Sequence, residues 1–306
     1  MVFSEVRNEI ILYACHDWGM GHVARSIPIL EQLINQGNTV YFAGNEKQVK
    51  IVSEYLSEIH FLTLKGGGFC FKGTGNWTKE MLRNGGKMLI NVQNDRRAVR
   101  EWVNFYDVTL VISDHRYGFY SKEVPSILIT HQLTLPVKGF QQAANLWHNL
   151  QLKKFSEIWV LDNKNHHYAG KLSQTNHNFN LSYIGIQSRF HREKTINEGY
   201  ILAVVSGPRP YAEQFFHEVV AYAKKHTFHI KCICPEVYES IYIPSNLTLI
   251  NQGTWKEMDE LFYHCDTILS RGGYTTIMDV ARLEKKAIYI PTPGQLEQEY
   301  LFEIHG

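Results

Sequence analysis

The chain has few cysteines, little excess charge and no hydrophobic run long enough to cross a bilayer. Its five cysteines are odd in number and scattered, which argues against a disulfide framework and is typical of a reducing compartment. The 31 basic and 30 acidic residues nearly balance, so the overall charge does not indicate a nucleic-acid partner. Because the first residues also lack the apolar core of a signal peptide, the sequence predicts a cytoplasmic protein.

Ligand sets for a metal ion are also scarce. Cys232 and Cys234 alternate in an apolar run that is typical of a strand, so their side chains share one face. No second pair of cysteines or histidines completes a tetrahedral site, and two buried thiols are therefore expected. The sequence predicts neither a bound metal nor a cofactor.

What the chain does contain is a repeated alternation of short apolar runs and longer helical patterns. A chain of 306 residues, 44% hydrophobic and 20% charged, is expected to form two globular domains. The alternation predicts an α/β fold with parallel sheets. We place the domains at residues 1–188 and 189–306, with the polar stretch 187–199 as the linker.

The apolar runs and helical patterns locate the elements of each domain. The predicted strands cover residues 10–15, 39–43, 59–64, 108–113, 126–130 and 158–161, then 200–205, 229–234, 247–250, 267–270 and 287–290. The predicted helices cover residues 23–35, 46–56, 77–103 and 139–155, then 211–226, 255–265, 274–283 and 296–304.

A glycine turn joins the predicted strand 267–270 to the helix that follows it, through Arg271, Gly272 and Gly273. Such a turn presents backbone N–H groups and the positive end of the helix dipole, which favour an anion. Asp279 follows about two helical turns on, where a carboxylate could accept hydrogen bonds from a ribose diol. The segment therefore indicates a nucleotide site.

A second glycine turn, with Gly19 and Gly21, follows the first predicted strand and ends in His22. Ligands bind at the carboxyl ends of strands in open parallel sheets, so we expect His22 to face a ligand. Its imidazole suits general-base work near neutral pH. The alternative is that the glycines only form the turn and that His22 caps the helix.

A similar loop, with Ser206, Gly207 and Arg209, precedes the predicted helix 211–226. Its hydroxyl, backbone N–H groups and guanidinium could hold a diphosphate. A plain strand-to-helix connection is the alternative interpretation.

Two further strands of the first domain are followed by polar side chains, Asp114 and His131. Parallel strands bring these residues to the same edge as His22. Single polar residues at such positions are common in structural loops, but three strand ends with His and Asp favour a catalytic group.

Two other segments allow more than one interpretation. The glycine-rich stretch 65–76 is either a mobile substrate loop or a long turn. The basic run at 96–100 is most simply a solvated helix face, and the sharper alternative is weak contact with anionic lipid at the inner face of the membrane.

Three segments together resemble the GT-B nucleotide-sugar glycosyltransferases, particularly the MurG-like and UDP-glycosyltransferase groups. The stretch 19–30 resembles the first-loop Gly-His and its proline-containing helix, Thr-His-Gln at 130–132 is similar to a His-Glu-Gln-Asn segment, and 266–298 resembles the donor-binding signature. The resemblance spans most of the chain. It implies two Rossmann-like domains whose sheets face a cleft, with the acceptor held by the first and the donor by the second.

The resemblance also implies roles for single residues. His22 would act as the base on an acceptor hydroxyl or contact the donor diphosphate. The residues matched to the donor site are Ser206, Gly207, Trp255, Gly272, Gly273, Thr276, Asp279 and Gln298. The reaction implied is inverting transfer from a UDP-sugar, without a metal, to a glycan, a lipid-linked acceptor or a small molecule.

The chain departs from the family at two points. Asp279 stands where the family usually has Glu, and only eight residues follow Gln298, so we expect either a truncated end or a different closure. The rival functions are a nucleotide-sugar hydrolase, whose loop also resembles the segment 21–25, a 2-epimerase, and a nucleotide-sugar binding protein without turnover.

Overall fold

The structure is a computed structural model that describes residues 3–137, 139, 141–234, 236 and 242–306. The chain divides into two compact units. The first contains Met1–Asp17, His22–Phe69 and Met81–Ser188, and the second contains Trp18–Gly21, Cys70–Glu80 and Arg189–Gly306.

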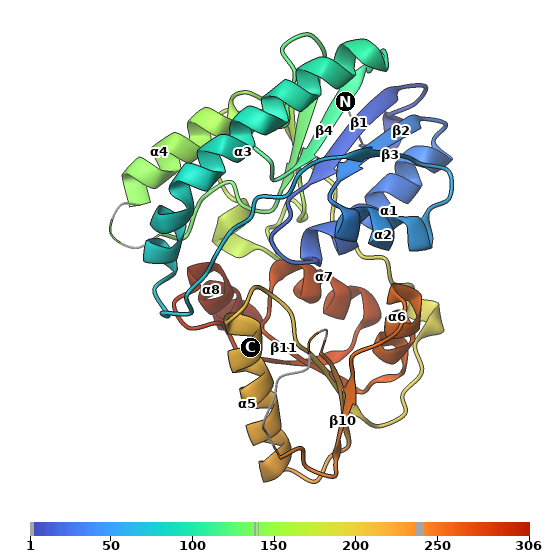
Figure 1. Cartoon of the computed structure of the whole chain (residues 1–306), viewed down its shortest axis with the longest axis vertical. Coiled ribbons are helices and arrows are strands. Elements are labelled where there is room, and N and C mark those ends of the chain that lie inside the picture. The colour runs from blue at the N-terminus through green and yellow to red at the C-terminus, as the bar shows by residue number, and fades with distance from the viewer. Residues whose placement is uncertain (1–2, 138, 140, 235, 237–241) are drawn as a thin grey trace. The chain divides into compact units, whose positions relative to one another are not determined.

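The first unit is built on a seven-stranded parallel sheet in the order β3-β2-β1-β4-β5-β6-β7 (Figure 1). Its strands are β1 (Ile10–Cys15), β2 (Thr39–Gly44), β3 (His60–Thr63), β4 (Leu110–Asp114), β5 (Ser126–Thr130), β6 (Glu157–Val160) and β7 (Leu181–Tyr183). The chain builds outward from β1 to β3 and then returns, so β4 pairs directly with β1. The strand order therefore reverses between β1 and β4, which is where open α/β sheets bind ligands.

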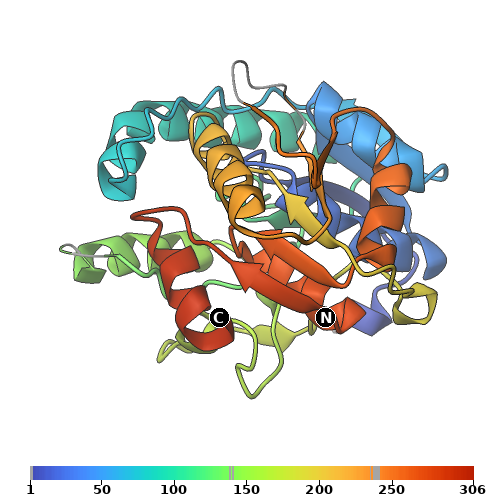
Figure 2. The same ribbon diagram turned by 90° about the horizontal axis from the view of Figure 1, so that it is seen from below.

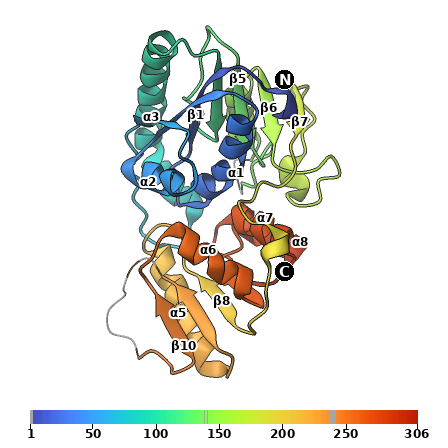
Figure 3. The same cartoon turned by 90° about the vertical axis from the view of Figure 1, so that its right-hand side faces the viewer.

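Helices cover both faces of this sheet. They are α1 (Gly21–Asn35), α2 (Glu46–Tyr55), α3 (Trp77–Phe105) and α4 (Gln141–Leu152), with 3-10 turns at Phe3–Glu5 and Gly170–Ser173. α1 covers one face of the sheet (Figure 3), where Tyr13 of β1 donates a hydrogen bond from its hydroxyl to Ser26 Oγ of α1 (2.8 Å). Leu12, the residue before Tyr13 in the strand, points to the opposite face and shares an apolar cluster with Val103 of α3.

The second unit contains a five-stranded parallel sheet in the order β10-β9-β8-β11-β12. Its elements are β8 (Ile201–Val204), α5 (Tyr211–Lys225), β9 (Ile230–Ile233), β10 (Leu247–Ile250), α6 (Trp255–His264), β11 (Thr267–Ser270), α7 (Tyr274–Leu283), β12 (Lys286–Tyr289) and α8 (Leu296–His305), after a 3-10 turn at Arg192–Lys194. Here the strand order reverses between β8 and β11. The two glycine loops expected to bind the donor follow these two strands.

Neighbouring residues of β8 show how the second sheet is covered. Ala203 lies in one apolar cluster with Phe215 and Val219 of α5. Leu202, which points to the other face, lies in a second cluster with Phe262 of α6 and Leu283 of α7. The helices α5 and α6 thus lie on opposite sides of the strands (Figure 2).

The predicted α/β fold with two parallel sheets is confirmed. Most element ends agree with the prediction within two residues, but the strand Leu181–Tyr183 was missed because it is short, half-buried and at the edge of the sheet. The predicted helix 139–155 is shorter, Gln141–Leu152, and its residue 140 lies outside the described residues. Within the described part of the chain, no helix is long and apolar enough to cross a membrane.

The glycine-rich stretch 65–76 forms no helix or strand over its described length. In the second unit, the fully buried carboxylate of Glu80 accepts hydrogen bonds from the backbone N–H groups of Lys72 (3.1 Å) and Thr74 (3.3 Å). This carboxylate therefore holds the end of the stretch in a defined turn.

Candidate functional site

The first part of the site lies at the carboxyl edge of the sheet in the first unit. Asp114 is the last residue of β4, and its backbone oxygen accepts from the N–H of His16, which follows β1 (2.9 Å). α1 begins at Gly21, so His22 and Arg25 stand three residues apart on one helical face. The switch point between β1 and β4 thus brings an acid, a base and a cation together.

Asp114 is fully buried and has partners at both carboxylate oxygens. Arg25 Nε donates to Oδ2 (2.8 Å) and Arg25 Nη2 donates to Oδ1 (2.5 Å), which is a bidentate fork. His22 Nδ1 lies 3.1 Å from the same Oδ1. Arg25 is 2% exposed and Asp114 is fully buried, so their ion pair is shielded from water, whereas the His22 side chain is 19% exposed.

Burial and charge set the protonation states of this group. Burial alone would raise the pKa of Asp114, but the charges of Arg25 and then His22 hold it well below its usual range. Burial, followed by the charge of Arg25, lowers the pKa of His22, while Asp114 opposes that shift. An ionised carboxylate beside an uncharged imidazole is the state that a general base requires.

Three more histidines surround His22. The ring of His16 is 5.4 Å from that of His22, the ring of His115 is 5.9 Å from it, and His131 stacks on His115 at 6.5 Å between centroids. Burial, and then the charge of His22, lowers the pKa of both His16 and His115 well below the usual range. His16 and His115 therefore stay uncharged near neutral pH.

The predicted residues His22, Asp114 and His131 all belong to this edge: His22 and Asp114 are within hydrogen-bonding distance of each other, and His131 stacks on His115. Sequence reasoning did not select Arg25 or His16 as site residues. The three-residue spacing of His22 and Arg25 on a predicted helix was a signal that could have identified Arg25. Among the described residues, no group of three His, Cys, Asp or Glu side chains is arranged to hold a metal ion.

The loop after β8 opens α5 in the second unit. Ser206 is exposed, and Gly207 adopts a φ of 102° that disfavours other residues. No side chain accepts a hydrogen bond at the amino end of α5. One backbone N–H of its first turn, that of Ala212, donates to the backbone oxygen of Pro208 (3.2 Å). Arg209 points to solvent and pairs with the carboxylate of Glu236.

The loop after β11 opens α7 in the same unit. Gly272 adopts a φ of 68°, and a Cβ there would press on the ring of Tyr289 at 3.2 Å. Gly273 is the N-cap without a side-chain hydrogen bond, and a Cβ there would meet nothing within 4 Å. The half-buried Thr276 lies in the first turn of α7. Open space above an uncapped helix end suits an anionic ligand.

Asp279 lies farther along α7 and is 5% exposed. Its Oδ2 is 3.7 Å from Nη1 of Arg189, whose remaining fork is directed at Asp259 with contacts of 2.7 to 3.2 Å. The Arg189 guanidinium also lies 5.3 Å from the ring centre of the half-buried Trp255. Asp279 and Trp255, both expected at the donor site, are thus linked by one arginine that the sequence did not indicate.

Two predicted donor contacts have internal partners. Arg271 is 4% exposed, and its Nη1 donates to Glu218 Oε2 (2.9 Å) and to the backbone oxygen of Ile290 (3.2 Å). Gln298 Oε1 accepts from the backbone N–H of Thr292 (2.8 Å). In this structure both side chains support the loops around β11 and β12.

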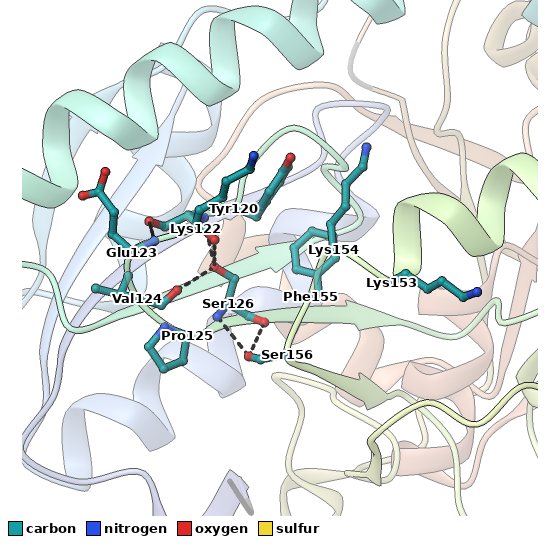
Figure 4. A pocket seen from close by; sticks show the side chains of 11 residues that line it. Tyr120, Lys122, Glu123, Val124, Pro125, Ser126, Lys153, Lys154, Phe155 and Ser156 are labelled. Atoms are coloured by element: carbon teal, nitrogen blue, oxygen red, sulfur yellow. Dashed lines mark hydrogen bonds between the residues drawn. The ribbon is translucent and has the colours of Figure 1, made fainter.

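A pocket in the first unit lies away from these residues (Figure 4). It is at the amino ends of β5 and β6, where Ser126 N donates to Ser156 Oγ (3.1 Å), and it is flanked by Lys122, Lys153 and Lys154. Strands of a parallel sheet begin at the edge opposite the one where they end, so this pocket is at the far edge from Asp114. None of the predicted site residues lines it.

Part of the second unit matches a known protein-family model. Residues 204–300, which include both glycine loops of the second unit, match the model of the glycosyltransferase family 28 C-terminal domain. A comparison of the sequence with curated proteins found no match.

Solved structures share the fold of the whole chain. The glycotransferase of kitacinnamycin matches with a TM-score of 0.68 and 13% identity over 97% of this chain and 85% of its own. Phytolacca americana UGT2, solved with UDP-2-fluoro-glucose and pterostilbene, has a TM-score of 0.65 and 12% identity over 95% and 82%. MurG of Acinetobacter baumannii has a TM-score of 0.54 and 14% identity over 96% and 82%. At these identities the likeness shows a shared fold.

Proposed function

We propose that the chain, whose second unit matches the glycosyltransferase family 28 C-terminal domain, is a GT-B-type glycosyltransferase that transfers a sugar from a UDP-sugar to an acceptor hydroxyl with inversion. The observation that carries the proposal is the pair of the half-buried His22 and the buried Asp114, with 3.1 Å between Nδ1 and Oδ1. The donor is assigned to the loops that open α5 and α7, and the base is assigned to the first unit.

The proposed chemistry follows from the tautomer of His22. When Nδ1–H donates to Asp114, the lone pair of Nε2 is directed away from the carboxylate and can take the proton of an acceptor hydroxyl. The acceptor oxygen then bonds to the anomeric carbon as the bond to the UDP oxygen breaks. Backbone N–H groups near Gly207 and Gly273 would stabilise the negative charge on the departing diphosphate.

Two comparisons support the donor assignment. The family 28 match covers both glycine loops of the second unit, and Phytolacca americana UGT2, with the same fold, was solved in complex with UDP-2-fluoro-glucose and pterostilbene. A thermal-shift panel of UDP, GDP and TDP tests the nucleotide, since a ligand of the folded state raises its apparent stability. Stabilisation by UDP is expected, and stabilisation by the other nucleotides alone would reject uridine.

Replacement of the base tests the mechanism. His22→Ala is expected to lower the transfer rate by about 10²- to 10⁴-fold, the usual contribution of a general base. UDP affinity, measured by calorimetry, should be unchanged, because the donor loops are in the other unit. His60→Ala, at an exposed histidine of β3, is the matched control and should retain the wild-type rate. Unaltered turnover by His22→Ala would exclude a role as base.

Hydrolysis of the nucleotide sugar is the second candidate. It is favoured by the four closely packed imidazoles at one edge, which could orient a water molecule, and by the resemblance of the loop 21–25 to that of a nucleotide-sugar hydrolase. UDP release without any acceptor separates the two functions. Release at the same rate with and without acceptor would support hydrolysis, and release that requires an acceptor would support transfer.

A further inference from the structure

The contact between Arg25 and His22 distinguishes this site from a simple pair of an acid and a base. Arg25 Nη2 lies 2.9 Å from His22 Nδ1 as well as 2.5 Å from Asp114 Oδ1. Since Nδ1–H is assigned to Asp114, Nη2 donates to the carboxylate and acts on the ring through its charge, so that one nitrogen of the guanidinium lies beside both members of the pair. Its fixed positive charge is as close to the imidazole as the negative charge of the carboxylate is.

The effect of this arrangement on His22 follows from electrostatics. A buried carboxylate alone favours the charged form of a neighbouring imidazole, whereas a guanidinium at equal range disfavours it. In this site the two charges are held together by the fork at Oδ1 and Oδ2. The opposite charges of Arg25 and Asp114 therefore nearly cancel at the His22 ring. Burial of the ring then decides whether it is protonated.

We propose that Arg25 is a positioning residue that keeps His22 uncharged near neutral pH by forking both oxygens of Asp114. This inference deepens the proposed function, since it takes His22 as the base. It gives Arg25 a role through Asp114 and His22, without contact with the substrate. With Arg25 in place, His22 is a weaker base, but its lone pair is free of a proton in a larger fraction of molecules near neutral pH.

Other groups around His22 do not supply this effect. The titratable side chains that face it from the neighbouring strand ends are His16, His115 and His131. None of them is a permanent cation, whereas arginine stays charged at every pH used for activity. Arg25, by contrast, is a permanent cation, and its Nη2 lies 2.9 Å from His22 Nδ1.

Ring titration of His22 by NMR tests the inference without any turnover. Spectra of ring-labelled histidine are followed against pH, with His22→Asn used to assign the signal. In wild type, His22 should titrate below the usual value of about 6.5. Arg25→Gln should move the titration up by about one pH unit, a tenfold change in proton affinity, and Asp114→Asn should move it down.

A neutral double variant protects the test against a folding failure. Arg25→Gln alone leaves Asp114 as an uncompensated buried charge, so it is the variant most prone to unfold. In Arg25→Gln/Asp114→Asn both charges are gone, and His22 should titrate above its value in Asp114→Asn. Equal titration in those two variants, or an unshifted titration in Arg25→Gln, would overturn the inference.

A second buried arginine provides the matched control. Arg116 also forks a buried carboxylate, donating from Nη2 to Asp95 Oδ1 (2.6 Å) and from Nε to Oδ2 (3.1 Å). Arg116→Gln should destabilise the unit in a similar way and leave the titration of His22 in place. A shift as large as that of Arg25→Gln would show that loss of any buried pair is sufficient, and the inference would fall.

The pH profile of transfer separates this inference from the proposed function. In Arg25→Gln the acid limb of kcat/KM should move to higher pH with the NMR titration, and Arg25→Lys, which keeps the charge, should restore the limb. If no acceptor supports turnover, the NMR result still decides the role of Arg25. If His22→Ala abolishes transfer but Arg25→Gln leaves the titration unshifted, the proposed function stands and this inference is wrong.

Discussion

Asp114 in the first unit and Asp279 in the second are both buried carboxylates next to an arginine, but the arginines hold them differently. Arg25 forks both oxygens of Asp114 at 2.5 and 2.8 Å. Arg189 directs its fork at Asp259 and comes only within 3.7 Å of Asp279. One carboxylate is the main partner of its arginine, and the other is a secondary partner.

The difference separates a scaffold carboxylate from one that a ligand could engage. A forked and fully buried pair can be opened only by leaving both charges without a partner, so Asp114 is suited to hold His22 in place. The longer contact between Asp279 and Arg189 is weaker. Hydroxyl groups of a ribose could donate hydrogen bonds to Asp279 in its place, while Arg189 stays paired with Asp259. The two carboxylates should therefore respond differently to substitution.

Removal of each carboxylate tests that contrast most directly. Asp114→Ala is expected to lower the free energy of unfolding by about 3–5 kcal/mol, because the Arg25 charge stays buried without its partner. Asp279→Ala should cost less, about 1–2 kcal/mol, because Arg189 retains its fork with Asp259. Urea unfolding followed by circular dichroism measures both. Equal losses would show that the two carboxylates serve the same structural purpose.

The dependence of stability on pH is the next largest expected effect. The pKa of Asp114 is lower in the folded chain than in the unfolded chain, so its stabilising contribution is fully present above the unfolded value of about 3.9. That contribution is lost as the pH falls below this value, at about 1.4 kcal/mol for each pKa unit of the shift. Asp114→Asn should therefore flatten the acid side of the stability curve.

Urea titrations at pH 3, 4, 5 and 7 check this expectation. Asp95→Asn is the control, because burial, the largest influence on this residue, raises the pKa of Asp95 despite its pairing with Arg116. Its removal should change the acid slope in the opposite direction. If Asp114→Asn kept the wild-type slope, the ionised state of Asp114 would not be part of what stabilises the first unit.

The sequence predicted the elements far better than the contacts between them. Alternating apolar runs identified β1, β5, β10 and β11 to the residue, because buried parallel strands are continuous apolar runs bounded by loops. The glycine loops could be placed because each one separates a strand from a helix. These signals are local, and each lies within a few neighbouring residues.

The partners of the site residues could not be predicted in this way. Arg189 is 70 residues from Asp259 and Arg25 is 89 residues from Asp114, so only the folded chain brings them together. Arg271 follows β11 in the glycine segment, yet it points inward to Glu218 of α5. Which way a side chain points at a loop depends on packing against elements that are distant in sequence.

The ribose contact proposed for Asp279 predicts an effect on ligand affinity. Asp279→Asn is expected to weaken UDP binding about tenfold, or about 1.4 kcal/mol, because an amide accepts less strongly than a carboxylate. Affinity for 2′-deoxy-UDP should change much less, since it lacks one of the hydroxyls. Calorimetry with both nucleotides measures the difference, and equal weakening of the two would place Asp279 away from the ribose.

The smallest effect is expected from lengthening this carboxylate. Asp279→Glu lengthens the side chain by one methylene and keeps the charge near Arg189, so UDP affinity should stay within about threefold of wild type. Preference for UDP over 2′-deoxy-UDP should also be retained. If Asp279→Glu weakened UDP as much as Asp279→Asn does, the 3.7 Å spacing to Arg189 would be what the site requires. Asp279 would then be a scaffold carboxylate like Asp114.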